Sequence, residues 1–437
     1  MKHFIYNGDE RHTFDSPSGW DIPIYSLPPE PPESGLTVSH LTEKAMSHCL
    51  GAPELDQILA PEKRVVILCD DNARPTPVWE ILPVLLERLF RGGIRKESID
   101  VVIASGTHAP LEEAELFSKL GRDITKNYRV SQHDCMAEDL IPIGRLETGC
   151  EIRINPIVAG ADILIGVGGI IPHPMNGFGG GPKILFPGVA NYEAIREHHL
   201  TYTVQSGSIF GNLDGNPFYE EICRIARMAG LNYSLNCVFD MYDQVASVLF
   251  GSFEAVHEKG AALSKELCGI GIPNRSDITL ISAYPYMEPL QIIKPLITGS
   301  LVTKPGGTII LLAKTNRPMP TSFVETFEEI LRSSDGRLRE YALATFESKR
   351  LLVETAPVDF NCALFFALNC SNDHRIVIVS QGLGREATER MGFIHYQNLE
   401  TAIEKESSVR PIASVNLIPI GAELPILPGG LNMDYMT

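Results

Sequence analysis

The sequence lacks the positive charge and the long apolar segments that would direct it to nucleic acid or to a membrane. Its 437 residues include 37 Lys or Arg and 54 Asp or Glu, which gives a formal net charge of -17. Nucleic acid and anionic membranes would repel such a chain, so neither is expected as a partner. No uncharged apolar run reaches the ~18 residues of a membrane helix, and residues 1–14 have no apolar signal core. These absences predict a soluble, cytoplasmic protein.

The sequence also lacks the usual metal and nucleotide motifs. Its nine cysteines are an odd number with no Cys-x-x-Cys spacing, and no His-Glu-x-x-His segment occurs, so reduced thiols are expected and zinc is not. A glycine-rich segment is present, but Gly177-x-Gly179 is followed by Gly180-Gly181-Pro182, which breaks the Gly-x-Gly-x-x-Gly pattern. Because Ile184 follows Lys183, the segment is not a P-loop either.

Alternating apolar runs and amphipathic segments predict an α/β protein with two α/β domains. Continuous apolar runs at 64–69, 99–104 and 161–165 are typical of parallel strands buried on both faces, and helices are expected at 77–89 and 111–120. A second alternating unit contains apolar runs at 278–282, 307–313, 362–367 and 375–380, which are predicted as strands, with a helix at 323–331.

This pattern predicts how the chain is divided. We expect a larger N-terminal, parallel-sheet domain over residues 1–270, a hinge at 269–273 and a smaller α/β domain over 275–410. The tail, residues 411–437, is expected to return to the N-terminal domain. The active site is expected in the cleft between the two domains.

Three polar clusters follow strands of the first predicted sheet. They are Asp70 to Arg74, Ser105 to His108, and the glycine-rich segment from Gly166 to Lys183. Ligands of open parallel sheets bind at the carboxyl ends of the strands, so these clusters predict one site. A helix is expected at 191–199, after the glycines, and the combination suggests an anion cradled by backbone N–H groups at a helix start.

Each candidate residue also has a structural interpretation. Asp71 could cap a helix that begins at Pro75 or Pro77, and His108 could be a solvated loop histidine. Arg74 has the fork geometry that suits a carboxylate or phosphate, and Lys183 suits an anion or a covalent attachment. The remaining candidates are a histidine between two prolines, His173, and two polar residues at i, i+3 spacing that could lie on one helix face, Gln291 and Lys294.

Taken in order, these motifs resemble the nickel-dependent lactate racemase family. The matching elements are Asp71-x-x-Arg74-Pro, Gly106-Thr-His108, Ile171-Pro-His173, Gly180-Gly181-x-Lys183, the helix that ends at His199, and Gln291-x-x-Lys294. The resemblance implies a racemase or 2-epimerase of an α-hydroxy acid, an isomerase that depends on a nickel-pincer nucleotide. This cofactor is a pyridinium-3,5-bisthiocarboxylic acid mononucleotide that carries nickel.

The resemblance also implies a role for each residue. Lys183 would carry the cofactor covalently, His199 would coordinate the nickel, and His108 and His173 would be the acid/base pair. Asp71, Gly179, Gly180 and Gly181 would contact the cofactor, while Arg74, Gln291 and Lys294 would bind the substrate, chiefly its carboxylate. Cofactor-biosynthesis proteins would be partners for loading, and the oligomeric state is left open.

The sequence departs from the family pattern at several positions. Ala73 and Gly179 stand where a threonine and a serine are expected, and His198 replaces an asparagine before the nickel ligand. Both tryptophans, Trp20 and Trp79, lie in the first third, whereas the lactate enzyme has one in its second domain near the substrate. A substrate other than lactate, such as an aldonate, is therefore expected. An NAD-type hydroxy acid dehydrogenase and a non-catalytic organic-anion binding protein are the alternatives.

Overall fold

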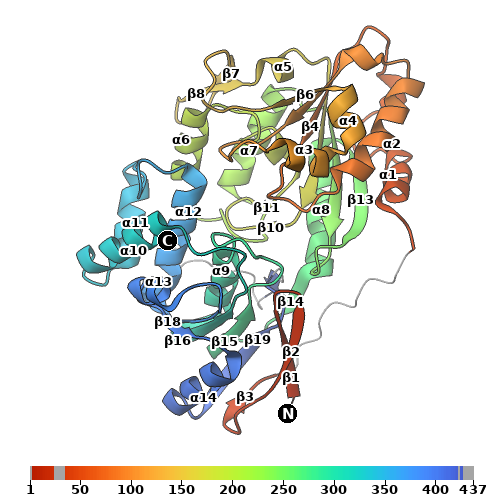
Figure 1. Ribbon diagram of the computed structural model, residues 1–437. Coiled ribbons are helices and arrows are strands. Elements are labelled where there is room, and N and C mark those ends of the chain that lie inside the picture. The colour runs from red at the N-terminus through yellow and green to blue at the C-terminus, as the bar shows by residue number, and fades with distance from the viewer. Residues whose placement is uncertain (1, 24–34, 422–423, 427–437) are drawn as a thin grey trace. The chain divides into compact units, whose positions relative to one another are not determined.

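The computed structural model describes residues 2–23, 35–421 and 424–426, and the chain forms two compact units (Figure 1). The central unit is Pro29–Leu267, and the terminal unit combines Met1–Pro28 with Cys268–Thr437. Both are built from strands and helices in alternation, as the apolar pattern predicted. The predicted boundary differs from the structure at the N-terminus, because residues 1–28 belong with the C-terminal part of the chain rather than with the domain that follows them.

A six-stranded sheet organises the central unit, with strand order β13-β12-β9-β4-β5-β6. All neighbouring strands are parallel except β13, which is antiparallel to β12. The elements of this unit are α1 (Val38–Met46), β4 (Val65–Cys69), α2 (Val78–Arg91), β5 (Ile99–Ile103), α3 (Glu113–Leu120), α4 (Arg122–Asn127), β6 (Arg129–Gln132), β7 (Ile141–Arg145), β8 (Glu151–Ile154), α5 (Pro156–Ala159), β9 (Ile163–Ile170), β10 (Pro172–His173), β11 (Gly177–Phe178), α6 (Tyr192–Tyr202), α7 (Pro217–Met228), β12 (Tyr233–Phe239), β13 (Val245–Gly251) and α8 (Phe253–Cys268).

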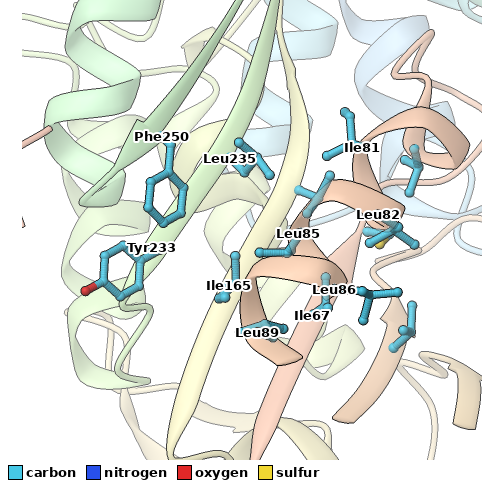
Figure 2. Packing of buried hydrophobic residues seen from close by; sticks show 14 of the residues in the cluster. Ile67, Ile81, Leu82, Leu85, Leu86, Leu89, Ile165, Tyr233, Leu235 and Phe250 are labelled. Carbon is cyan, nitrogen blue, oxygen red and sulfur yellow. The ribbon is translucent and has the colours of Figure 1, made fainter. Parts of the chain in front are cut away.

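Helix α2 shows why the central sheet is buried on the face that it covers. Its apolar residues recur every three or four positions, and in Figure 2 Leu85 and Leu89 lie beside Ile67 and Ile165 of the sheet, with Ile81 in the same cluster. These five side chains are buried. Truncation of one such leucine to alanine typically costs about 2–5 kcal/mol, because the transfer free energy is lost and a cavity remains.

The third predicted strand is longer than expected. The apolar run at 161–165 continues through glycines, so that β9 extends to Ile170. The glycines allow close packing: a Cβ on Gly166 would lie 2.5 Å from the Ile184 side chain, and one on Gly169 would lie 2.5 Å from the Phe239 ring. Part of the segment expected to be an irregular turn is therefore a central strand.

A parallel sheet also organises the terminal unit, in the order β18-β17-β16-β15-β19-β3. Its elements are β1 (Lys2–Asn7), β2 (Glu10–Asp15), β3 (Trp20–Asp21), β14 (Gly269–Gly271), β15 (Ser276–Ser282), α9 (Ile293–Val302), β16 (Thr303–Leu312), α10 (Thr321–Ser333), α11 (Leu338–Glu347), α12 (Val358–Asp373), β17 (Arg375–Val379), α13 (Arg385–Arg390), β18 (Ile394–Tyr396), α14 (Leu399–Val409), β19 (Ala413–Ile418) and β20 (Leu424–Ile426).

Described segments near both ends of the chain are part of this second sheet. Strand β19 pairs with β15, and the short β3 pairs with β19. The predicted return of the tail to the N-terminal domain is therefore wrong for residues 413–418, because their backbone bonds complete the terminal sheet. Trp20, in β3, is 5% exposed and donates its indole N–H to the carbonyl of Arg410. Residues 427–437 lie outside the described part of the chain.

One predicted strand is a helix. Residues 362–367 lie inside α12, whose residues are buried along most of its length. A helix that is apolar on all sides has the same short apolar runs as a buried strand, so the periodicity could not separate the two. Among the described residues, no helix has the length and apolar character needed to cross a membrane.

The order of the central strands locates the candidate site. The chain proceeds from β4 through β5 to β6 on one side, then begins again at β9 and continues to β12 on the other. The sheet reverses its direction of growth between β4 and β9, and such a switch point is where ligands bind at the carboxyl ends of strands. Asp71 follows β4, His108 follows β5, and the glycine-rich turn follows β9.

Candidate active site

Asp71 and His108 form a direct pair across the ends of two neighbouring strands. His108 Nδ1 lies 2.5 Å from Asp71 Oδ2, and the other carboxylate oxygen accepts the backbone N–H of Ala73 at 2.9 Å. The His108 side chain is 38% exposed, while that of Asp71 is 7% exposed. In the neutral form of this imidazole, Nδ1–H donates to the carboxylate and the lone pair is on Nε2.

The charge of Asp71 is maintained by this pairing. Burial alone would raise its pKa, but the hydrogen bond and charge of His108, with the nearby guanidinium of Arg74, lower it below its ordinary value. The alternative that Asp71 caps α2 is wrong, because that helix begins at Val78 after an N-cap, Pro77, that makes no side-chain capping bond. The carboxylate orients a histidine instead.

A buried lysine supports the loop that carries Asp71. Lys119, in α3, is 3% exposed, and its ammonium donates to the carbonyls of Arg74 and Thr76, each at 3.1 Å. It also lies 2.8 Å from Asp70 Oδ1, while the Thr76 hydroxyl donates to Asp70 Oδ2 at 2.6 Å. The network fixes the backbone on both sides of Asp71 and Arg74.

His173 lies in a two-stranded hairpin beyond β9, where β10 pairs with β11. Its ring is 9% exposed, and Nδ1 accepts the backbone N–H groups of Met175 at 3.3 Å and Asn176 at 3.2 Å. These bonds place the proton of the neutral ring on Nε2. His108 and His173 are thus held in opposite tautomers.

The glycine turn that follows is built by contacts with distant residues. A Cβ on Gly180 would lie 2.7 Å from the carbonyl oxygen of Gly169, and one on Gly181 would lie 2.6 Å from the His257 ring. Both glycines have positive φ, +76° and +52°. At Gly179 a Cβ would meet only ordinary contacts, the nearest at 3.5 Å, so the backbone does not require glycine there.

Two buried side chains hold this turn. Asn236 Oδ1 accepts the N–H of Gly181 at 2.9 Å, and His257 Nε2 donates to the carbonyl of Gly179 at 3.0 Å. Burial lowers the pKa of His257 to about 4, so its ring is neutral near pH 7. The turn leads into a short 3-10 helix, Gly181–Ile184, and not into α6. The predicted anion cradle at the start of α6 therefore does not match the structure.

Lys183 and His199 contact the same aromatic ring. Phe218, in α7, lies 5.6 Å from the Lys183 ammonium and 5.0 Å from the His199 ring centroid. His199 is 6% exposed, and burial together with the Lys183 charge lowers its pKa to about 3. The ring is therefore neutral, and its Nδ1 donates to the carbonyl of Ile195 at 2.8 Å. Nε2 retains the lone pair, which is the arrangement of a metal-binding histidine.

His198 has a different environment. Its ring is fully buried among Phe186, Tyr202 and Phe218, and its Nε2 donates to the carbonyl of Phe218 at 3.2 Å. The remaining nitrogen, Nδ1, is buried without a hydrogen-bond partner. Of the two adjacent histidines, only His199 combines a partner on Nδ1 with a lone pair on Nε2, so the geometry favours it as the ligand.

Gln291 and Lys294 belong to the terminal unit. Gln291 lies in the turn before α9, and Lys294 is in the first turn of that helix, with its ammonium 4.8 Å from the centroid of the Tyr286 ring. Their backbones are joined by a bond from Lys294 N to Gln291 O at 3.1 Å. The positive end of the helix dipole and the lysine both favour an anion at this position.

The residues fit a lysine-bound organic group that brings its own metal. No group of three or more His, Cys, Asp or Glu side chains that could hold a metal ion occurs among the described residues. One imidazole beside an amine could complete the coordination of a metal that is already held by other atoms. Three buried polar atoms of the same unit have no hydrogen-bond partner: His257 Nδ1, Asn176 Oδ1 and Ser105 Oγ.

Several of these supporting residues have no local sequence signal. Phe218, Asn236 and His257 follow the glycine turn by tens of residues and lie in no motif. His257 is fully buried, with its ring against Gly181. Lys119 resembles any lysine near a helix end, and only its burial distinguishes it.

This chain is similar to known proteins over most of its length. A family model described as the lactate racemase N-terminal domain matches residues 8–211. A lactate racemase of Lactiplantibacillus plantarum is 29% identical over 391 residues, which are 88% of this chain and 90% of the relative. A lactate racemase of Thermoanaerobacterium thermosaccharolyticum is 26% identical over 88% of this chain and 89% of the relative.

Solved structures support the fold. The lactate racemase apoprotein of Thermoanaerobacterium thermosaccharolyticum matches with a TM-score of 0.84 and 24% identity, over 98% of this chain and 100% of that chain. A protein of Thermotoga maritima matches with a TM-score of 0.64 and 18% identity, over 93% and 100%. The fold seen in these structures is the fold of this chain.

Proposed function

The chain belongs to the lactate racemase family of isomerases, and from this premise we propose that it inverts C2 of an α-hydroxy acid as a racemase or 2-epimerase. The observation that carries the proposal is the pairing of His108 with Asp71. A histidine whose Nδ1 is bonded to a carboxylate has a basic Nε2, and the resulting imidazolium is stabilised by the same charge.

The proposed cofactor is a nickel-pincer nucleotide attached to Lys183. His199 Nε2 would complete the nickel coordination, and Asp71 with the turn from Gly179 to Gly181 would contact the cofactor. When bound, the cofactor supplies an electrophilic carbon that accepts hydride from C2. Such a route avoids removing a proton beside a carboxylate that is already negative. Cofactor-biosynthesis proteins would be needed for loading, and we place the protein in the cytoplasm.

The two histidines would move the hydroxyl proton. For one enantiomer, His108 Nε2 takes this proton and Asp71 holds the imidazolium. For the other, His173 faces the opposite side of the substrate and exchanges the proton through its own Nε2. As an acid His173 must carry a second proton on Nδ1, and it must then give up the two amide bonds that this nitrogen accepts. His108 is therefore the histidine that is ready to act as a base.

The substrate would be held through its carboxylate by Arg74, Gln291 and Lys294. Guanidinium and ammonium groups give charge-assisted bonds to a carboxylate. We propose a substrate larger or more polar than lactate, such as an aldonate. This choice rests on Ala73 and Gly179, which lack the expected hydroxyls, and on the two tryptophans: one is in α2 and the other, Trp20, is in the core of the terminal unit.

The decisive experiment uses holoprotein with a panel of α-hydroxy acids in deuterated water. Inversion at C2 with retention of the original hydrogen supports hydride transfer, whereas wash-in of deuterium supports ordinary proton abstraction. Net conversion of the acid to a keto acid with loss of activity on dialysis would favour an NAD-type dehydrogenase. Stabilisation by an organic anion with no inverted product would favour a non-catalytic binding protein.

Residue assignments are tested separately. We expect about one nickel per chain and a mass adduct on Lys183 that is absent from Lys183→Arg. His108→Gln and His173→Gln should both abolish inversion while retaining the adduct. His133→Gln is a matched control, because this buried histidine donates to the carbonyl of Ala190 and has no proposed catalytic role. Full activity in either catalytic variant would contradict the acid/base assignment.

A further inference from the structure

One buried amide links the His173 hairpin to the helix that contacts Lys183 and His199. Asn216 is fully buried, and its Nδ2 donates to the carbonyls of Met175 and Asn212, each at 2.9 Å. Its Oδ1 accepts the backbone N–H of Tyr219 at 3.1 Å and so caps the start of α7. The side chain therefore satisfies both its donors and its acceptor within the protein.

The contact with Met175 bears directly on His173. Met175 supplies one of the two backbone N–H groups that His173 Nδ1 accepts, and Asn216 binds the carbonyl of the same residue. The hairpin has little freedom elsewhere: Gly177 has φ +73°, and a Cβ there would lie 2.0 Å from the carbonyl oxygen of Asn212. The Asn216 amide binds Met175, in the hairpin, and Asn212, in the segment that packs against Gly177. It therefore fixes the hairpin against this segment.

The other end of the link is α7. Phe218 lies in the first turn of this helix and contacts the His199 ring and the Lys183 ammonium. A cap on α7 therefore sets the position of the ring that both groups share. Hydrogen bonds from one amide thus reach the backbone beneath His173 and the helix beside Lys183.

We propose that Asn216 is a positioning residue that holds His173 in the tautomer with its proton on Nε2 and sets its place relative to Lys183 and His199. The proposal rests on the proposed function for its catalytic meaning, but the tautomer is a property of the protein alone. Loss of the amide donors would free the Met175 backbone, and the Nδ1 of His173 would no longer face two fixed N–H groups.

The first test needs no cofactor or substrate. Protein labelled with ¹⁵N-histidine is examined at pH 7.5 by two-bond proton–nitrogen correlation, and the His173 signals are assigned by their loss in His173→Gln. We expect wild-type His173 to carry its proton on Nε2. A proton on Nδ1 of the wild-type ring would overturn the proposal outright.

The second test changes the amide. Asn216→Ser keeps an oxygen that caps α7 and removes both donors, and we expect His173 to become a mixture of tautomers. Asn398→Ser is the matched control, since Asn398 caps α14 through the N–H of Thr401 on an exposed surface, and it should leave His173 unchanged. An unchanged His173 in folded Asn216→Ser would contradict the proposal.

Asn216→Asp is the second variant, because it keeps the size and the cap and lacks the donors. Loss of the fold in both variants would assign Asn216 to stability alone and would overturn the proposal. In active holoenzyme, kcat of Asn216→Ser should fall about 10- to 100-fold with little change in KM, because His173 Nε2 loses its fixed place and this loss outweighs the easier protonation of Nδ1. If the tautomer responds but no α-hydroxy acid is inverted, the proposed function fails and the positioning role stands.

Discussion

The replacement Lys119→Met tests whether the buried lysine supports the loop that carries Asp71. The methionine preserves most of the apolar length of the side chain and removes all three N–H donors. Three partners are then left in a buried environment: the carbonyls of Arg74 and Thr76 at 3.1 Å and Asp70 Oδ1 at 2.8 Å. Burial already raises the pKa of Asp70 against the opposing effect of Lys119, so without the lysine this carboxyl would bind a proton more readily.

The expected cost is large because both ends of the contact are inside the protein. Removing one partner of a buried ion pair typically lowers the free energy of unfolding by about 3–5 kcal/mol. The double variant Lys119→Met, Asp70→Asn removes the stranded charge and should recover about 1–2 kcal/mol of that loss. Lys63→Met is the matched control: Lys63 pairs with Asp162 at 3.8 Å, and the side chains are 40% and 43% exposed. It should cost less than about 1 kcal/mol.

The measurement is equilibrium unfolding in urea followed by circular dichroism, with all four proteins at pH 7.5. An effect of Lys119→Met no larger than that of Lys63→Met would refute the reasoning. So would a double variant that is less stable than the single one, because the charge of Asp70 would then be stabilising without its partner.

Two further predictions concern the glycine turn. The free energy of unfolding should fall as the pH drops from 6.5 toward 4, because His257 binds a proton near pH 6.5 in the unfolded chain but only near pH 4 in the folded one. The contribution of this histidine is about 3 kcal/mol. In urea titrations, His257→Gln should show a shallower decline of stability with falling pH. Gly181→Ala should lose about 1–3 kcal/mol, because of its positive φ and the His257 ring, whereas Gly179→Ala should change stability by less than about 1 kcal/mol. Equal losses at the two glycines, or an unchanged pH dependence, would contradict these contacts.

Local pattern was sufficient for the first strands and for the position of the polar clusters. Apolar runs of β-branched residues predicted β4 and β5 because burial on both faces of a parallel sheet demands them. The rule that ligands lie at carboxyl ends then placed Asp71, His108 and the glycine turn at one edge. The structure confirms the fold, and it brings Asp71 and His108, 37 positions apart in the sequence, into contact.

The sequence pattern gave a wrong prediction where the same apolar run is compatible with two kinds of secondary structure. The apolar run at 362–367 fits a buried strand and a buried helix equally, and only the surrounding chain makes it part of α12. The assignment of the segments near the two ends of the chain failed for a related reason. Hydrogen bonds from β3 and β19 could satisfy any parallel edge, and nothing in residues 20–21 or 413–418 specifies which sheet they join.

The sequence by itself determined the class of the fold, the family resemblance and the residues at the strand ends, because these depend on periodicity and on short motifs. Only the tertiary structure decided how those residues are used. It set the opposite tautomers of His108 and His173, and it distinguished His199 from His198 as the candidate metal ligand. It also brought Lys119 and Asn216 into contact with the backbone that carries the site residues. The physical reason is that a proton's place on an imidazole depends on the groups that face its nitrogens. For His108 that group is Asp71, from another strand end, and for His173 it is nearby backbone whose carbonyl at Met175 is held by the distant Asn216.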